Sequence, residues 1–265
     1  MKSEYTLAVQ TALKAGEAIL EVYRGSDFQV ESKADDSPLT LADRRANEII
    51  TEALEKTSYP LLSEEGKTIP YMNRSWWQEF WMVDPLDGTK EFLKRNNEFT
   101  VNIAMVRDGK ADFGVVYAPV LKLLYLGVPG LGAFRCNEEK NFTQPIDYLV
   151  QFATPLPDRD PGDEEFKVVA SRSHFTRETE NYVNSLDYGD KPLKLIPSGS
   201  SLKLCMVAEG SAHLYPRLGP TMEWDTAAAH AVVKAAGKNI YRLEDGRELE
   251  YNKENLLNPD FVVKE

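Results

Sequence analysis

Two aspartates, Asp84 and Asp87, follow directly on an apolar run in the segment WMVDPLDGTKEF, residues 81–92. A strand that ends at Asp84 would place its carboxylate at the end of a sheet, where open α/β sheets bind their ligands. Pro85 fixes one backbone angle and Gly88 allows another, so the bend between them can turn Asp87 toward the same point. Two carboxylates held this close repel each other unless a cation or a proton lies between them.

Glu64 supplies a third carboxylate, because it also follows a short apolar run that is typical of a strand. Together with the backbone carbonyl of Leu86 in the bend, these carboxylates form an all-oxygen set. Such a set suits Mg²⁺, at about 2.0–2.1 Å, better than zinc. The alternative for Asp87 is that it only caps a helix beginning at Gly88, which would leave Asp84 unexplained.

Two other acidic motifs do not fit this segment. An EF-hand loop that started at Asp84 would need an oxygen side chain at its third position, where Leu86 stands, and a glycine at its sixth. Haloacid dehalogenase phosphatases place their aspartates two apart, whereas these are three apart. A helix predicted over residues 88–95 instead begins with Gly88 and Thr89, whose backbone N–H groups could bind an anion such as phosphate.

The elements around the acidic segment can be predicted from periodicity. Apolar residues recur at helical spacing over residues 4–24, and the pattern resumes at about Thr40. Asp43 therefore lies in the first turn of the second helix, where the helix dipole favours an acid. Beyond the acidic segment, two strands joined by a tight turn at Asp108 and Gly109 are predicted, and two further strands extend their sheet.

The second half of the chain alternates strands and helices, which is typical of layered α/β architecture. The expected strands are at 166–170, 193–197 and 212–215, and the expected helices at 177–185, 200–208 and 225–236. A polar, proline-containing stretch precedes them. We therefore expect an N-terminal α+β lobe over residues 1–145 and a C-terminal α/β lobe, carrying Asp225, over residues 146–265.

Composition limits the classes of partner. A chain of 265 residues with 42% hydrophobic residues can bury a sizeable core. Its net charge of -11 opposes attraction to a nucleic acid polymer. No stretch approaches the roughly 20 apolar residues of a membrane helix, and Cys136 and Cys205 occur without a secretory signal. We expect a reduced, cytoplasmic protein without an integral membrane segment; peripheral membrane association and the oligomeric state stay open.

Three separated motifs, SEEG (63–66), WMVDPLDGTKEF (81–92) and WDTAAAHAVVKAAG (224–237), resemble in order and spacing those of the inositol monophosphatase superfamily. These enzymes are magnesium-dependent, lithium-sensitive phosphatases, and the likeness spans nearly the whole chain. The resemblance implies an α/β fold, a layered αβαβα sandwich of the sugar phosphatase type. It also implies hydrolysis of a phosphoric monoester with two or three Mg²⁺ ions, at a site where the two lobes meet.

The resemblance also implies roles for individual residues. The metal ligands would be Glu64, Asp84, the Leu86 carbonyl, Asp87 and Asp225. Asp43 would accept a hydrogen bond from the Thr89 hydroxyl, whose oxygen could then accept one from the attacking water. Two metals about 3.5–4 Å apart could activate that water and stabilise the leaving oxygen. The alternative for Asp43 is a first-turn acid without a catalytic task.

Three further segments, VVASRSH (168–174), SGSSLK (198–203) and YPRLGPTMEWD (215–225), are similar to the 3'(2'),5'-bisphosphate nucleotidase branch. That likeness implies removal of the 3'-phosphate of adenosine 3',5'-bisphosphate (PAP) to give AMP, with PAPS as a further substrate. Such a reaction would clear a by-product of sulfate assimilation. The substrate contacts expected on this basis are Glu64, Leu86, Asp87, Gly88, Thr89, His174, Ser200, Lys203, Arg217 and Asp225.

The residues of these segments suit a nucleotide. His174 offers a flat ring that could stack on a base. Ser200 and Lys203 lie one helical turn apart near a helix N-terminus, and Arg217 could contact a second phosphate. Plainer alternatives are that Ser200 caps the helix and that the other side chains are solvated. Glu223 could instead contact a hydroxyl of ribose or of an inositol phosphate.

Other functions compete with this hypothesis. An inositol monophosphatase or a fructose-1,6-bisphosphatase-like sugar phosphatase would use the same metal chemistry. A metal-dependent nucleotide-binding protein without turnover is an alternative of another class. That alternative gives no reason for Thr89 and Asp43 to accompany the metal carboxylates.

Overall fold

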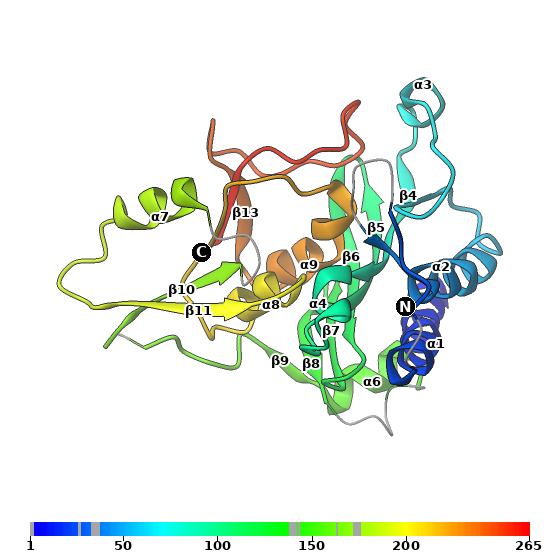
Figure 1. Ribbon diagram of the computed structural model, residues 1–265, viewed down its shortest axis with the longest axis horizontal. Coiled ribbons are helices and arrows are strands. Elements are labelled where there is room, and N and C mark those ends of the chain that lie inside the picture. The colour runs from blue at the N-terminus through cyan, green and yellow to red at the C-terminus, as the bar shows by residue number, and fades with distance from the viewer. Residues whose placement is uncertain are drawn as a thin grey trace.

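Helices and sheets alternate as layers in the structure, which is a computed structural model (Figure 1). It describes residues 3–25, 28–32, 38–137, 142, 144–162, 164–171 and 176–265. Two helices cover one face of a seven-stranded sheet, two more pack on its other face, and two smaller sheets lie beyond these. Helix α7 (Arg177–Asn184) lies outermost. The layered αβαβα sandwich expected from the sequence is confirmed.

The first helical layer consists of α1 (Ser3–Arg24) and α2 (Leu41–Leu54). The apolar stripe of α1, which includes Ala8, Ala12 and Ile19, is buried in the core cluster on this side of the main sheet. Both helices lie where the helical spacing predicts them. They cover the face of the sheet opposite to the one on which α8 (Leu202–Ala208) and α9 (Glu223–Ala235) pack.

Seven strands form the main sheet in the order β3-β4-β5-β6-β7-β8-β9. β3 and β4 are parallel, and the later neighbours are antiparallel. The hairpin predicted at Asp108 and Gly109 joins β5 to β6. The bounds are β3 Leu61–Ser63, β4 Glu79–Asp87, β5 Thr100–Arg107, β6 Lys110–Ala118, β7 Leu123–Val128, β8 Gly132–Cys136 and β9 Thr154–Leu156.

The strand that carries Asp84 does not end there, contrary to the prediction. β4 continues to Asp87, with Asp84 opposite Asn102 and Asp87 opposite Thr100 in β5. Three steps along β4 match two along β5, so the strand contains a bulge with one extra residue. Pro85 lies inside this bulge, where its missing N–H leaves no ladder bond unmade. The predicted bend is therefore a bulge within the strand.

On the other face of the main sheet lie α8 (Leu202–Ala208) and α9 (Glu223–Ala235). α9 is rich in alanine and comes so close to β6 that a Cβ at Gly114 would stand 2.1 Å from the Ala228 carbonyl oxygen. A glycine is therefore required at this position. Small residues on both elements bring α9, and with it Asp225, down onto the main sheet.

The outer β layer consists of two small sheets. β10 (Phe166–Ser171) pairs in parallel with β11 (Leu193–Ser198), and an antiparallel sheet has the order β12 (Tyr215–Arg217), β14 (Phe261–Lys264), β13 (Asn239–Arg242). The remaining elements are β1 Glu31–Ser32, β2 Pro38–Leu39, α3 Tyr71–Arg74, α4 Thr89–Leu93 and α6 Ile146–Phe152. Helix α4 is thus shorter than the helix predicted over residues 88–95.

The chain around the expected lobe boundary remains attached to the main sheet. The backbone N–H of Ile146, at the start of α6, donates to the Thr6 hydroxyl at 3.2 Å, and β9 pairs with β8. Residues of α9 share a buried cluster with the main sheet. The division into lobes at residues 145 and 146 stays a prediction.

Two expectations about the chain as a whole can be compared with the structure. Cys136 and Cys205 are both buried and form no disulfide in the part of the chain that the structure describes, as expected of packed rather than paired cysteines. Of the helices in the described residues, none combines the length and the apolar character needed to cross a membrane.

His230 on α9 should give the stability of the protein a pH dependence. Its ring is fully buried, with Nδ1 2.8 Å from the Tyr251 hydroxyl and Nε2 2.7 Å from Asn239 Oδ1. Burial lowers the pKa of His230 to about 4. Because the unfolded chain binds this proton at about pH 6.5, the free energy of unfolding should fall as the pH drops from about 6.5 to about 4. The loss should be on the order of 2–3 kcal/mol.

Denaturant titrations at about pH 7 and about pH 5 would test this, with His230→Gln as the comparison. Glutamine can hydrogen-bond but cannot be protonated, so the variant should lose less stability than the wild type on acidification. Stability curves that run parallel for the two proteins would contradict the assignment.

Candidate active site

Three buried or half-buried carboxylates meet near the ends of β3 and β4 and at the start of α9. One oxygen each from Glu64, Asp84 and Asp225 lies within 4.8 Å of the others, and the described residues form one such group. The parallel pairing of β3 with β4 brings Glu64 and Asp84 to the same edge. The packing of α9 supplies Asp225. The structure thus brings together three of the four carboxylates that the sequence analysis expects around a metal.

The charges of this group are unbalanced within the protein itself. Burial raises the pKa of Asp84 well above its usual range, and repulsion from Glu64 and Asp87 raises it further. Burial also raises the pKa of Asp225, followed by repulsion from Asp87. A divalent cation among these oxygens would offset both the repulsion and the cost of burial. The donor set therefore fits a hard cation.

Asp87, the fourth expected carboxylate, lies outside this group. Its Oδ2 accepts hydrogen bonds from the Ser201 backbone N–H at 2.6 Å and from the hydroxyls of Ser200 at 2.6 Å and Ser201 at 2.7 Å. Asn102 Nδ2 adds a longer contact of 3.4 Å. Within the described chain, every hydrogen bond to this side chain ends on Oδ2, which leaves Oδ1 for a cation. The assignment of Asp87 as a metal ligand stays a prediction.

The bulge between these aspartates is held by local contacts. The Leu86 backbone N–H donates to Asp84 Oδ1 at 3.0 Å, and the Thr89 hydroxyl oxygen lies 3.4 Å from the Leu86 carbonyl oxygen. Gly88 has a φ of +93°, and a Cβ there would stand 3.1 Å from the Glu98 carbonyl oxygen. Glycine at 88 thus permits both the left-handed backbone and the close contact.

Thr89 and Asp43 lie together, as the resemblance implies. Asp43 is buried at the first turn of α2, and its Oδ2 accepts from the Thr40 backbone N–H at 2.7 Å and the Thr40 hydroxyl at 2.5 Å. These bonds turn its Oδ1 toward the Thr89 hydroxyl at 3.4 Å. Asp43 therefore closes a capping box and also faces Thr89, so the first-turn reading and the catalytic reading are compatible.

A cavity of 540 Å³ opens beside these groups. Of the expected ligands and substrate contacts, those that line it are Glu64, Asp87, Gly88, Thr89, Ser200, Lys203, Arg217 and Asp225. Asp43, Asp84 and Leu86 are buried and lie outside this lining. The lining therefore combines residues from both halves of the chain.

Two buried cationic side chains, Lys203 and Arg217, line the same cavity. Lys203 Nζ donates to the Ser200 carbonyl at 2.5 Å, and burial lowers its pKa, with Asp87 opposing that effect. Arg217 Nη2 donates to the Pro220 carbonyl at 2.8 Å, while its buried Nε has no hydrogen-bond partner among the described residues. The alternative that these are solvated surface charges is therefore wrong.

Ser200 has a different environment from that of a helix cap. Its φ is +53°, and α8 begins only at Leu202. Its hydroxyl donates to Asp87 and lies 2.7 Å from Thr100 Oγ1. The capping alternative is therefore wrong, and the expected contact with substrate stays a prediction.

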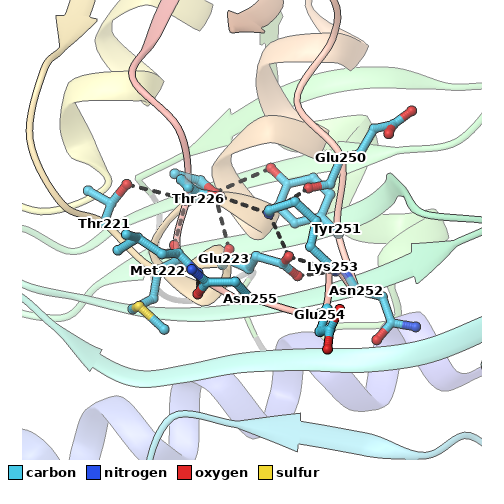
Figure 2. Close-up of polar contacts among 12 residues, drawn as sticks. Thr221, Met222, Glu223, Thr226, Glu250, Tyr251, Asn252, Lys253, Glu254 and Asn255 are labelled. Carbon is cyan, nitrogen blue, oxygen red and sulfur yellow. Dashed lines mark hydrogen bonds and ion pairs between the residues drawn. The ribbon is translucent and has the colours of Figure 1, made fainter. Parts of the chain in front are cut away.

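Glu223 does not face the cavity. Figure 2 shows its carboxylate directed toward the loop of Asn252 and Lys253. It accepts from the backbone N–H groups of both residues, at 2.5 and 3.0 Å, and from Lys253 Nζ at 2.6 Å, and it is fully buried. The suggestion that Glu223 contacts a sugar hydroxyl is therefore wrong. His174, expected to stack on a base, lies outside the described residues.

Sequence reasoning missed several polar residues around Asp87. Ser201 follows Ser200 in the segment SGSSLK, and the two serines cannot be told apart by type. Asn102 and Thr100 are polar residues on alternate positions of an otherwise apolar strand, opposite the two aspartates. That alternation was the available signal, because buried polar side chains in a strand need partners.

Comparison with known proteins identifies the family. The model of the inositol monophosphatase family matches residues 1–263. A 3'(2'),5'-bisphosphate nucleotidase CysQ of Salmonella typhimurium is 45% identical over 258 residues, which is 96% of each chain. The crystal structure of CysQ from Bacteroides thetaiotaomicron has a TM-score of 0.91 and 48% identity, covering 100% of this chain and 97% of its own. The suhB protein of Bartonella henselae has a TM-score of 0.73 and 26% identity, with 97% and 92% covered.

These matches agree with the geometry of the site. The family model covers the segments that carry all the clustered carboxylates and the pair of Thr89 and Asp43. The similarity extends over the whole fold rather than over isolated motifs. The chain belongs to the inositol monophosphatase family.

Proposed function

We propose that the protein is a phosphoric monoester hydrolase that removes the 3'-phosphate of PAP in the presence of Mg²⁺, giving AMP and phosphate, and that PAPS is a further substrate. One observation carries this proposal. A group of buried and half-buried carboxylates and two buried cationic side chains are adjacent to the same cavity of 540 Å³. The first suits metal ions and the second suits an additional phosphate. The nucleotidase relatives, at 45% identity over 96% of the chain, support the substrate class.

The residues that would hold Mg²⁺ are Glu64, Asp84, the Leu86 carbonyl, Asp87 and Asp225, with two or three ions in all. The donors are all oxygen, and the raised pKa values of Asp84 and Asp225 indicate charge that the protein itself does not neutralise. When bound, Mg²⁺ polarises the phosphate and makes water more acidic.

Asp43 and Thr89 would orient the attacking water. The two bonds from Thr40 hold Asp43 with one oxygen toward the Thr89 hydroxyl. If that hydroxyl gives its one hydrogen to Asp43 rather than to the Leu86 carbonyl, its oxygen can still accept a hydrogen bond, and Thr89 lines the cavity. A water that donates to Thr89 would thus be held in one direction, and fixed direction is the main contribution of positioning to catalysis.

Lys203 and Arg217 would bind the 5'-phosphate of the nucleotide. Both are buried, so their charges are less screened than those of surface residues. Arg217 also has an unsatisfied Nε among the described residues. A substrate with one phosphate would use only the carboxylate side of the cavity, so this pair favours a bisphosphate.

The compartment and the partners are also proposals. We propose that the protein acts in a reducing cytoplasm, as its two buried cysteines support, since neither forms a disulfide among the described residues. Its partner would be a small nucleotide and not a nucleic acid polymer, which its charge of -11 opposes.

Phosphate release from PAP, inositol 1-phosphate and fructose 1,6-bisphosphate would test the function. Each substrate should be measured with Mg²⁺, with EDTA and with added Li⁺. We expect PAP to be the preferred substrate, with release lost in EDTA and reduced by Li⁺. A preference for either sugar phosphate would overturn the substrate assignment, and nucleotide binding without release from any substrate would overturn the proposal of an enzyme.

A further inference from the structure

Ser201 links the two halves of the carboxylate site. We infer that it is a positioning residue, which holds Asp87 and Asp225 at the separation that a bound cation requires. This inference deepens the proposed function and rests on its cation. Ser201 lies within the segment SGSSLK, but neither the expected metal ligands nor the expected substrate contacts include it.

The contacts of Ser201 are short and buried. Its backbone N–H and its hydroxyl lie 2.6 and 2.7 Å from Asp87 Oδ2, and the same hydroxyl lies 2.8 Å from the carbonyl oxygen of Asp225. The side chain is 1% exposed. Since Asp87 belongs to β4 and Asp225 to α9, one serine touches both sides of the site.

Two residues of β5 fix the Ser201 hydroxyl in turn. Asn102 Nδ2 donates to Ser201 Oγ at 2.8 Å, and the Thr100 hydroxyl donates to Asn102 Oδ1 at 2.9 Å. The bulge in β4 sets both residues opposite the aspartates. Because a buried network with satisfied partners permits one arrangement, the main sheet determines where Ser201 lies.

This arrangement has a consequence for Asp87. The Ser201 backbone N–H and the Ser200 hydroxyl donate to Oδ2, and the Ser201 hydroxyl shares its one hydrogen between Oδ2 and the Asp225 carbonyl oxygen. These contacts restrain the carboxylate from rotating, and Oδ1 is the oxygen left without a hydrogen bond among the described residues. A ligand whose orientation is fixed before the cation arrives loses less conformational freedom on binding. Partners that orient metal ligands in this way typically change metal affinity by 10–100-fold when they are removed.

The test is Ser201→Ala, which removes the hydroxyl and keeps the backbone N–H. EDTA-treated protein would be titrated with Mn²⁺, followed by electron paramagnetic resonance, and with Mg²⁺, followed by calorimetry. We expect the dissociation constant to rise about tenfold. Asn102→Ala should shift it in the same direction.

Ser198→Ala is a matched control. Ser198 is also a buried serine, 5% exposed, and lies three residues before Ser201, at the end of β11. It makes no hydrogen bond to Asp87 or Asp225 within the described chain, so its cation affinity should equal that of the wild type. The melting temperature of Ser201→Ala in EDTA shows whether the hydroxyl positions the metal ligands or stabilises the fold. A positioning role leaves that melting temperature near the wild-type value and lets turnover recover at saturating Mg²⁺.

Unchanged cation affinity in Ser201→Ala would overturn the inference. If Ser201→Ala does not fold in EDTA, Asn102→Ala takes its place in the test. Its cation affinity and its melting temperature in EDTA are then compared with those of the wild type. Failure of the proposed function has a different signature: wild-type protein would bind Mn²⁺ and release no phosphate from PAP, while Ser201→Ala would still lose cation affinity.

Discussion

Asp84→Asn should abolish phosphate release, by a factor on the order of a thousand or more. Asp84 is 2% exposed and belongs to the group formed with Glu64 and Asp225, so the substitution removes a charge from the centre of the cation site. The amide oxygen can still accept the hydrogen bond from Leu86 N–H. The bulge in β4 should therefore survive, and circular dichroism should match the wild type. A variant with near-normal turnover would refute the assignment of this site.

The same variant should respond differently to cations. In EDTA it should melt no lower than the wild type, because burial and neighbouring carboxylates disfavour the charge that is removed. Added Mg²⁺ should raise the melting temperature of the wild type and not that of the variant. Asp108→Asn is a matched control, since it makes the same change in the hairpin turn, where asparagine tolerates the φ of +49°.

Arg217→Met should discriminate between substrates with one and two phosphates. Loss of a charged hydrogen bond to the 5'-phosphate should lower kcat/KM for PAP by about 10- to 100-fold, mainly through KM. Hydrolysis of adenosine 3'-monophosphate should change by less than about threefold, because that substrate has no group for Arg217 to bind. Both values come from phosphate release at saturating Mg²⁺.

A surface arginine provides the control for this prediction. Arg247 has a side chain that is 79% exposed and an ion pair with Asp245 at 3.7 Å. Arg247→Met should leave both substrates unaffected. Equal losses on the bisphosphate and the monophosphate in Arg217→Met would assign Arg217 to the reacting phosphate or to the shape of the cavity, and not to a second phosphate.

Local patterns in the sequence were sufficient to predict that Asp84 and Glu64 form part of an acidic site, whereas the family resemblance supplied Asp225. Asp84 and Glu64 follow apolar runs, and the parallel pairing of two adjacent strands is enough to bring them together. The pair of Thr89 and Asp43 depends on contacts between distant segments, and the family resemblance supplied it. The structure gives the physical reason for this pair: the hydrogen bonds from Thr40 to Asp43 Oδ2 orient the Asp43 carboxylate.

The parts that could not be predicted depend on contacts distant in sequence. Which of Ser200 and Ser201 bonds to Asp87 through its backbone is decided by the left-handed φ of Ser200 and by Asn102 on another strand. The bulge in β4 depends on its register with β5. Glu223 was suggested as a contact for a sugar hydroxyl because its position resembles one that inositol-type enzymes use, whereas Lys253 and its loop bind its carboxylate.

The origin of Asp225 on α9 also bears on how the chain reaches its native state. Its partners at 64 and 84 belong to a different part of the chain, so no early folding fragment can contain a complete binding group. Cation binding should therefore leave the folding rate unchanged and lower only the unfolding rate. If the proposed Mg²⁺ binds, the lifetime of the folded protein, and hence its resistance to proteases, would depend on the concentration of free magnesium around it.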